Sequence, residues 1–141
     1  MDKALSSSFE SFYNRIKEVL IESRSRVYLI ANSEMVLAYW NIGRIIFQEE
    51  QKGQSRADYG NLLIETLSTK LTSEFGKGFN KSNLWNMIKF YKTFPIIDAV
   101  RRELTWTHYR ILIYIENEDA RNFYLKETIE SKWSTRQLER Q

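Results

Sequence analysis

Residues 59–95, YGNLLIETLSTKLTSEFGKGFNKSNLWNMIKFYKTFP, carry the clearest periodicity in the chain. Apolar residues recur every four positions in the first half of this stretch, and three and four positions apart in the second half. Such spacing gives a helix one buried face. Gly76 and Gly78 between the two runs permit the left-handed backbone that ends a helix. The stretch therefore predicts two amphipathic helices joined by a tight basic turn, a helix-turn-helix-like unit at about 57–95.

The second helix of this unit has a polar side suited to DNA. Asn80 or Ser82 can cap its first turn by accepting a hydrogen bond from a free backbone N–H. Opposite the apolar stripe, a helical wheel places Ser82, Trp85, Asn86, Lys89 and Thr93. Cations suit phosphates and an amide suits base edges. Asn86 is the residue that we expect to read a base.

The positive charge is concentrated around the same unit. The whole chain has a net charge of only +3. Between residues 76 and 110, seven cations face two carboxylates, a local charge of +5; the cations are Lys77, Lys81, Lys89, Lys92, Arg101, Arg102 and Arg110. A basic segment of this kind is typical of a phosphate-binding face, although a solvated surface is the alternative.

The remaining sequence also predicts helices. Apolar spacing indicates one helix around 9–20 and a second over 27–51, in which Gly43 would mark close packing. Pro95 should end the second helix of the unit, because the residue before a proline disfavours helical geometry. Further helix starts are expected at Ser55 with Asp58, at Thr105, at Asn117 and at Ser134 with Gln137. We expect one all-α, multi-helix domain over 1–141, with a second helix pair at about 105–132. The last helix stops after one or two turns, so the chain is expected to be a fragment of a longer protein.

Composition excludes several kinds of site. The 141 residues are 43% hydrophobic, which suits one folded domain, and they include no cysteine and a single histidine, His108. A histidine-dependent triad, a thiolate metal site and a disulfide framework are therefore excluded. His108 is expected to be a surface or cap residue. No catalytic set, metal site or cofactor is expected in this fragment, and no membrane span or signal peptide, so a cytoplasmic protein is expected.

The four tryptophans raise the possibility of base stacking. Packing is the expected role for Trp40, Trp106 and Trp133, which lie in the most apolar helix or at helix junctions. Trp85 lies at the border between the apolar and polar faces of its helix. Either packing or contact with nucleic acid fits that position.

Three separated strings resemble the N-terminal domain of the YhcG family: AYWNIGRIIFQEEQKGQSRADYG, LSTKLTSEFGKGFNKSNLWNMIKFYKTFP and ELTWTHYRILIYIENEDARNFYLKETIESKWSTRQLERQ. The resemblance covers roughly residues 13–141. It implies an all-helical domain of DNA-binding character that precedes a C-terminal nuclease domain of the PD-(D/E)xK type. Such a nuclease domain would be a partner within the same chain, and it would hold the catalytic residues.

Two functions follow from the sequence. The first is a non-catalytic DNA-binding and substrate-positioning module of a larger nuclease. The second is a helical protein-interaction or oligomerisation module of the same protein, in which apolar helix faces bury surface against another copy or subunit. DNA and a second copy are therefore both expected partners, and the two roles are compatible.

Overall fold

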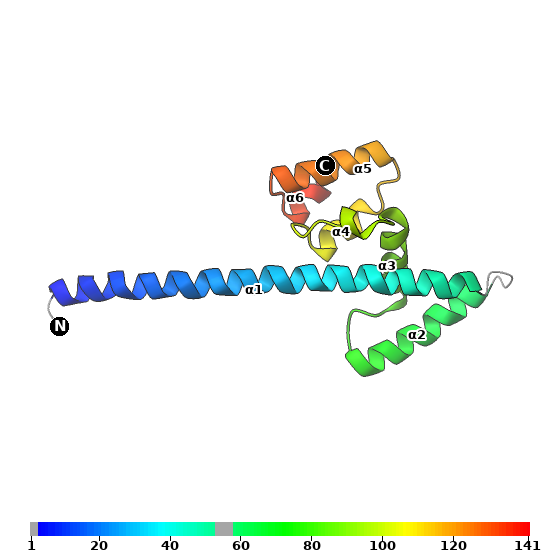
Figure 1. The fold of residues 1–141 in the computed structure, drawn as a ribbon, viewed down its shortest axis with the longest axis horizontal. Helices are drawn as coiled ribbons and strands as arrows, with labels where there is room; N and C mark the ends of the chain where they lie inside the picture. Colours follow the sequence, from blue (N-terminus) through cyan, green and yellow to red (C-terminus); the bar gives the residue numbers. More distant parts are fainter. Residues whose placement is uncertain (1–2, 53–57) are drawn as a thin grey trace.

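The computed structural model describes residues 3–52 and 58–141, and within them it contains helices and no strand. Its elements are α1 (Lys3–Lys52), α2 (Tyr59–Phe75), α3 (Lys81–Thr93), a 3₁₀ turn η1 (Ile97–Ala99), α4 (Trp106–Leu112), α5 (Glu118–Glu130) and α6 (Thr135–Glu139). Figure 1 shows α1 as a long rod whose C-terminal half is crossed by α3, with α2 on one side and α4–α6 on the other. The prediction of an all-α fold is confirmed.

Helix α1 corrects one prediction, because it is continuous where we expected two helices. It runs for 50 residues without a break between positions 20 and 27. The intervening IESRSR contains neither glycine nor proline, so nothing in it ends a helix. Arg26 instead pairs with Glu22 one turn earlier, at 3.4 Å, which supports helix locally.

The helix and turn boundaries of the 59–95 stretch agree with the sequence. Gly76 and Gly78 both have positive φ, at 84° and 106°, and Asn80 rather than Ser82 caps α3, accepting a hydrogen bond from the Asn83 N–H at 2.7 Å. Helix α3 ends at Thr93, before Pro95. The expected cap at Ser55 lies outside the described residues. Asp58 stands at the N-cap of α2 without a side-chain hydrogen bond.

The later helix starts are also confirmed. The Thr105, Asn117 and Ser134 side chains each accept a hydrogen bond from a backbone N–H in the first turn of α4, α5 and α6 respectively. Helix α4 ends at Leu112. His108 is a cap residue, as expected, but it is 8% exposed and so is not on the surface.

The core has two parts, both built on the crossing of α1 and α3. One joins α1 and α2 to α3 through Ile46, Ile64, Leu84, Met87 and Ile88. The other joins α1 and α3 to the C-terminal helices and includes Trp40, whose indole N–H donates to the Phe94 carbonyl at 2.7 Å. A Cβ on Gly43 would lie 2.0 Å from the Met87 carbonyl oxygen, so glycine permits the close crossing. The expected packing role of Gly43 is confirmed.

Candidate nucleic-acid interface

A stripe of three lysines and one tryptophan runs along the part of α3 that the core leaves uncovered. Lys81, Trp85, Lys89 and Lys92 are spaced four, four and three residues apart, so they share one face of the helix. We call these four residues the α3 stripe. Lys81 and Lys92 are exposed, Trp85 is 37% exposed and Lys89 is half-buried. The stripe spans about 17 Å at the helical rise of 1.5 Å per residue.

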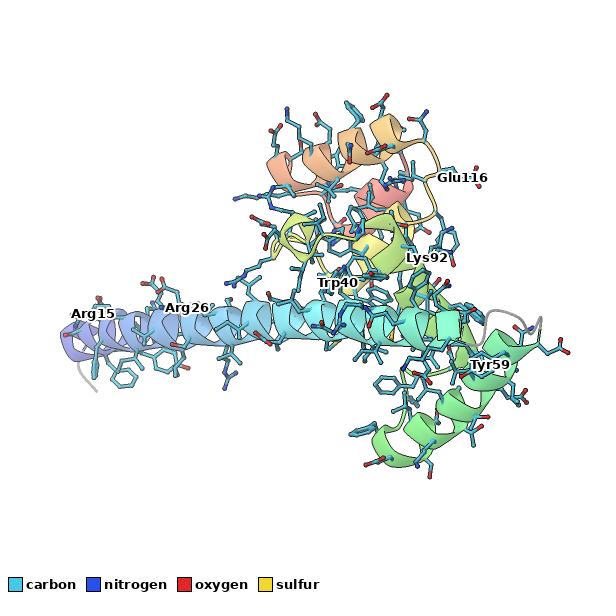
Figure 2. The ribbon with its side chains drawn as sticks, turned by 45° about the vertical axis from the view of Figure 1, so that its right-hand side comes forward. Arg15, Arg26, Trp40, Tyr59, Lys92 and Glu116 are labelled. Atoms are coloured by element: carbon cyan, nitrogen blue, oxygen red, sulfur yellow. The ribbon has the colours of Figure 1, made fainter. Side chains whose placement is uncertain are left out.

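An open groove of about 490 Å³ lies beside the C-terminal half of the stripe. Its walls come from the end of α1, from α3 and from the second residue beyond α4. They include Phe47, Glu50, Gln51, Trp85, Lys89, Lys92, Thr93 and Tyr114. The Lys92 Nζ lies 5.9 Å from the centre of the Phe47 ring, and Figure 2 shows Lys92 near the C-terminal part of α1. The groove thus combines two ammonium groups with aromatic surface, and Glu50 is its acidic member.

Tyr114 completes this groove, although no sequence pattern marks it as a site residue. Its side chain is 60% exposed, and the Lys89 Nζ lies 5.0 Å from its ring centre. Its hydroxyl donates a hydrogen bond to the Asn86 side-chain oxygen. The exposed Trp85 and Tyr114 rings therefore flank Lys89 from two different elements.

Asn86 requires a correction. It is 5% exposed, and its amide oxygen is used by Tyr114. The prediction that Asn86 lies on the free side of α3 is wrong, because Tyr114, two residues beyond the end of α4, covers that position. Asn86 joins two elements and does not present its amide to a base.

The N-terminal end of α3 adds further polar groups. Lys77, in the turn, and Lys81 and Ser82, in the first helical turn, are all exposed. They surround the positive end of the helix dipole, where backbone N–H groups favour anions. Arg110 is exposed on α4. In sequence, Arg110 lies between Trp106 and Tyr114, whose side chains donate hydrogen bonds to Asn83 and Asn86 of α3.

Arg101 and Arg102 belong to a different place on the surface. They lie beside Ser33 and Leu37 of α1, whereas the groove next to the stripe begins at Phe47. Ten residues of α1 separate these positions, about 15 Å along the helix. The sequence grouped all seven cations, but the structure separates this pair from the α3 stripe.

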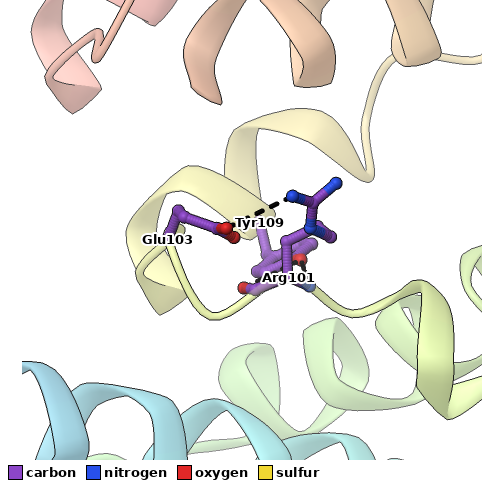
Figure 3. Close-up of polar contacts among 3 residues, drawn as sticks. All are labelled: Arg101, Glu103 and Tyr109. Atoms are coloured by element: carbon purple, nitrogen blue, oxygen red, sulfur yellow. Dashed lines mark hydrogen bonds and ion pairs between the residues drawn. The ribbon is translucent and has the colours of Figure 1, made fainter. Parts of the chain in front are cut away.

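Tyr109 holds the loop that carries Arg101, as Figure 3 shows. The Arg101 backbone N–H donates to the tyrosine oxygen at 2.6 Å. Burial raises the pKa of Tyr109 to about 12. The Arg101 guanidinium forms a 3.2 Å ion pair with Glu103. A backbone hydrogen bond, aided by Arg101, holds the pKa of Glu103 below its usual value.

The cations of the stripe are not neutralised by neighbouring carboxylates. In residues 3–52 and 58–141, the ion pairs are Arg26–Glu22, Lys52–Glu49, Arg101–Glu103 and Lys126–Glu130. Lys81, Lys89 and Lys92 take part in none of them. The described part of the chain also contains no group of three or more His, Cys, Asp or Glu residues that could hold a metal ion.

His108 has a structural position. Its Nδ1 accepts the Thr105 backbone N–H at 3.1 Å, so Nε2 carries the proton and donates to the Trp133 carbonyl at 2.9 Å. The ring thus ties α4 to the start of α6. Trp106 and Trp133 are half-buried and pack against the core, which confirms their expected role together with that of Trp40.

Comparison with known proteins identifies related sequences. Residues 15–141 match the DUF1016 N-terminal domain. The chain is also similar to "Putative nuclease YhcG" of Escherichia coli (strain K12), with 30% identity over 173 aligned positions that cover 100% of this chain and 46% of the relative. The chain therefore spans about half the length of that relative. No solved structure matches the chain, and within the described residues no helix combines the length and apolarity needed to cross a membrane.

Proposed function

The chain belongs to the DUF1016 N-terminal domain family, and we propose that it is the DNA-binding, substrate-positioning part of a nuclease. In this proposal the chain contributes no catalytic group. Cleavage is the task of a nuclease domain elsewhere in the same protein. The name of the bacterial relative supports the link to a nuclease, and the α3 stripe supports the binding role.

The single observation that carries the proposal is the unpaired charge of the stripe. Three lysines share one face of α3, and none of them forms an ion pair with a carboxylate of residues 3–52 or 58–141. An ammonium group of this kind can bind a phosphate without giving up an ion pair within the protein. Each phosphate that it neutralises releases condensed counterions from the DNA. Lys77 and Arg110, at the two sides of the N-terminal half of α3, extend the same contact.

The exposed aromatic rings define what else the groove would hold. Trp85 and Tyr114 are 37% and 60% exposed, and both line the groove. Rings beside cations stack on unpaired bases with little regard to sequence. With Asn86 buried, the stripe presents no exposed amide for base-edge recognition. We therefore expect binding that depends weakly on sequence and favours duplex ends or junctions with unpaired bases.

Arg101 and Arg102 would supply a second contact with the backbone. Their separation of about 15 Å from the groove corresponds to about four base pairs at 3.4 Å each. A duplex that follows the C-terminal half of α1 would reach both places. Arg101 already pairs with Glu103, so this contact should contribute less than the stripe.

Fluorescence anisotropy with labelled duplex DNA at low salt tests the proposal. The Lys89→Glu, Lys92→Glu variant should weaken binding by about tenfold or more, since it removes two cations and adds two anions at the interface. The matched control is Lys70→Glu, Lys126→Glu, which changes the net charge equally at exposed sites on α2 and α5. Equal losses in both variants, or no binding by the native chain, would contradict the proposal.

A further inference from the structure

The N-terminal half of α1 exposes an apolar surface that the rest of the chain does not cover. Each residue from 6 to 31 is exposed, and large apolar side chains recur throughout this stretch. Figure 1 shows this part of α1 extending away from the other helices. Helices in water obtain most of their stability from burying an apolar face. We call residues 6–31 the α1 arm. A binding partner would bury its exposed apolar side chains.

The apolar residues of the arm form one seam. Phe9, Tyr13, Ile16, Leu20, Val27 and Ile30 are separated by steps of four and three, with Ser23 at the intermediate position. This is the repeat by which two helices pack side by side. The exposed fractions of the six run from 49% to 66%. Glu18 and Glu22 lie on the opposite side of the helix.

We propose that a second copy of this chain covers the seam, with the two α1 arms antiparallel and the two-fold axis at residue 18. In this register Phe9 packs on Val27 of the second copy, Tyr13 on Ser23 and Ile16 on Leu20. Each contact occurs twice because the interface is isologous.

The position of the core is compatible with this register. Helix α1 meets the core near Val36, which is 2% exposed. An axis at residue 18 lies 18 residues before Val36 and leaves the cores of the two copies at opposite ends. The C-terminal end of the seam, at Ile30, lies beside Arg102 and Glu103, with which it lines a pocket.

Charge complementarity favours this register over the one that is shifted by one heptad toward the core. It places Glu10 beside Arg24 of the second copy, twice. Shifting the arms by one heptad, to an axis between residues 21 and 22, would instead place Lys17 beside Arg24, which is repulsive. The proposed register brings Lys17 near its own symmetry mate, one repulsive pair against two attractive ones. The flexible lysine stem relieves much of that repulsion.

The area is sufficient for a stable dimer. Phe12 and Val19 border the seam and are 43% and 61% exposed, which brings the apolar side chains of the face to eight. At about 100 Å² of exposed surface each, they could bury up to about 800 Å² per copy, which is what each partner buries in an interface of standard size.

Mass measurement by light scattering over a concentration series tests the association. The native chain should have twice its 16.9 kDa mass, and the Ile16→Glu, Leu20→Glu variant should have the single-chain mass with unchanged folding of the core. The matched control, Ser11→Glu, Ser25→Glu, adds the same charges on the opposite face of the arm and should remain a dimer. A single-chain mass for the native protein at every concentration overturns the proposal.

Disulfide trapping tests the orientation without a background, because the chain contains no cysteine. The Phe9→Cys, Val27→Cys variant should cross-link two chains on oxidation. Phe9→Cys alone should not, since the two copies of residue 9 would be about 27 Å apart. Cross-linking by the single variant would indicate parallel arms and overturn the antiparallel register.

Discussion

Gly43 is the residue on which the crossing of α1 and α3 depends. The atoms nearest to a Cβ at this position are backbone atoms, the Met87 carbonyl oxygen at 2.0 Å and carbon at 2.5 Å. Backbone atoms inside a helix cannot rotate away as a side chain can. The two helices must therefore separate to admit even one methyl group.

We predict that Gly43→Ala lowers the free energy of unfolding by about 2–3 kcal/mol, because it overpacks a helix crossing. Gly60→Ala is the control. A Cβ there meets the end of the flexible Glu50 side chain at 2.5 Å, so that variant should stay within about 1 kcal/mol of the native chain. Urea titration measures both. A smaller loss for Gly43→Ala than for Gly60→Ala would contradict the packing account.

Ionisation of Tyr109 makes the free energy of unfolding depend on pH in the alkaline range. In the unfolded chain its hydroxyl ionises near its ordinary pKa of 10.0, whereas in the folded protein the pKa is about 12. The folded state therefore binds more protons between these values, and stability falls as pH rises from 10.0 to about 12. The expected contribution is of the order of 2 kcal/mol.

The Tyr109→Phe variant isolates this effect. It should be less stable at neutral pH by about 1 kcal/mol, because the hydrogen bonds to the Arg101 backbone are lost. Its stability should also decline less than that of the native chain above pH 10.0. Urea midpoints measured from neutral to alkaline pH give the difference in stability at neutral pH and the decline above pH 10.0. Parallel pH curves for the two proteins would show that Tyr109 does not titrate as described.

At the scale of the element, α3 depends on its cap. Asn80 accepts the Asn83 N–H at 2.7 Å, whereas Ser82 is an exposed residue of the first turn. Asn80→Ala should cost about 1 kcal/mol of stability. Ser82→Ala should cost little, since serine has no capping role there. Thermal unfolding of the two variants tests the assignment, and equal losses would refute it.

The elements show which features the sequence could predict. Caps, glycine turns and the boundary at Pro95 depend on neighbouring residues, so their positions were predicted from local chemistry. The single α1 was missed because the apolar pattern weakens between residues 20 and 27, although no residue there interrupts a helix. A weak apolar pattern does not end a helix unless the sequence also contains a residue that terminates it.

The misplaced site residues have a different cause. A helical wheel places Asn86 on the polar side of α3, but Tyr114, 28 positions away, occupies that side. Arg101 and Arg102 are close to the other cations in sequence, but Tyr109 fixes their loop against the middle of α1. Tertiary contacts decided both positions, and one sequence does not reveal such contacts.

At the scale of the whole molecule, the two proposed surfaces are far apart. The groove beside the stripe includes Phe47, 29 residues along α1 from the proposed two-fold axis, so two grooves in a dimer would be about 87 Å apart. The antiparallel arms also point the two cores in opposite directions. One straight duplex would then not contact both copies.

DNA affinity should therefore be independent of association. The Ile16→Glu, Leu20→Glu variant is expected to bind a short duplex within about twofold of the native affinity, with one duplex for each chain in both proteins. Titration with labelled DNA at concentrations above the dissociation constant gives the stoichiometry. A large loss of affinity would show that DNA contacts both copies.

The salt dependence of DNA binding tests the central claim most directly. On a duplex too short to reach Arg101 and Arg102, five cations surround the proposed contact: Lys77, Lys81, Lys89, Lys92 and Arg110. At about 0.9 per neutralised phosphate, the logarithm of the binding constant should fall with log salt at a slope of about −4.5. Lys89→Ala, Lys92→Ala should reduce the slope to about −2.7, whereas Lys70→Ala, Lys126→Ala should leave it unchanged. An unchanged slope in the Lys89 and Lys92 variant would place DNA elsewhere on the molecule.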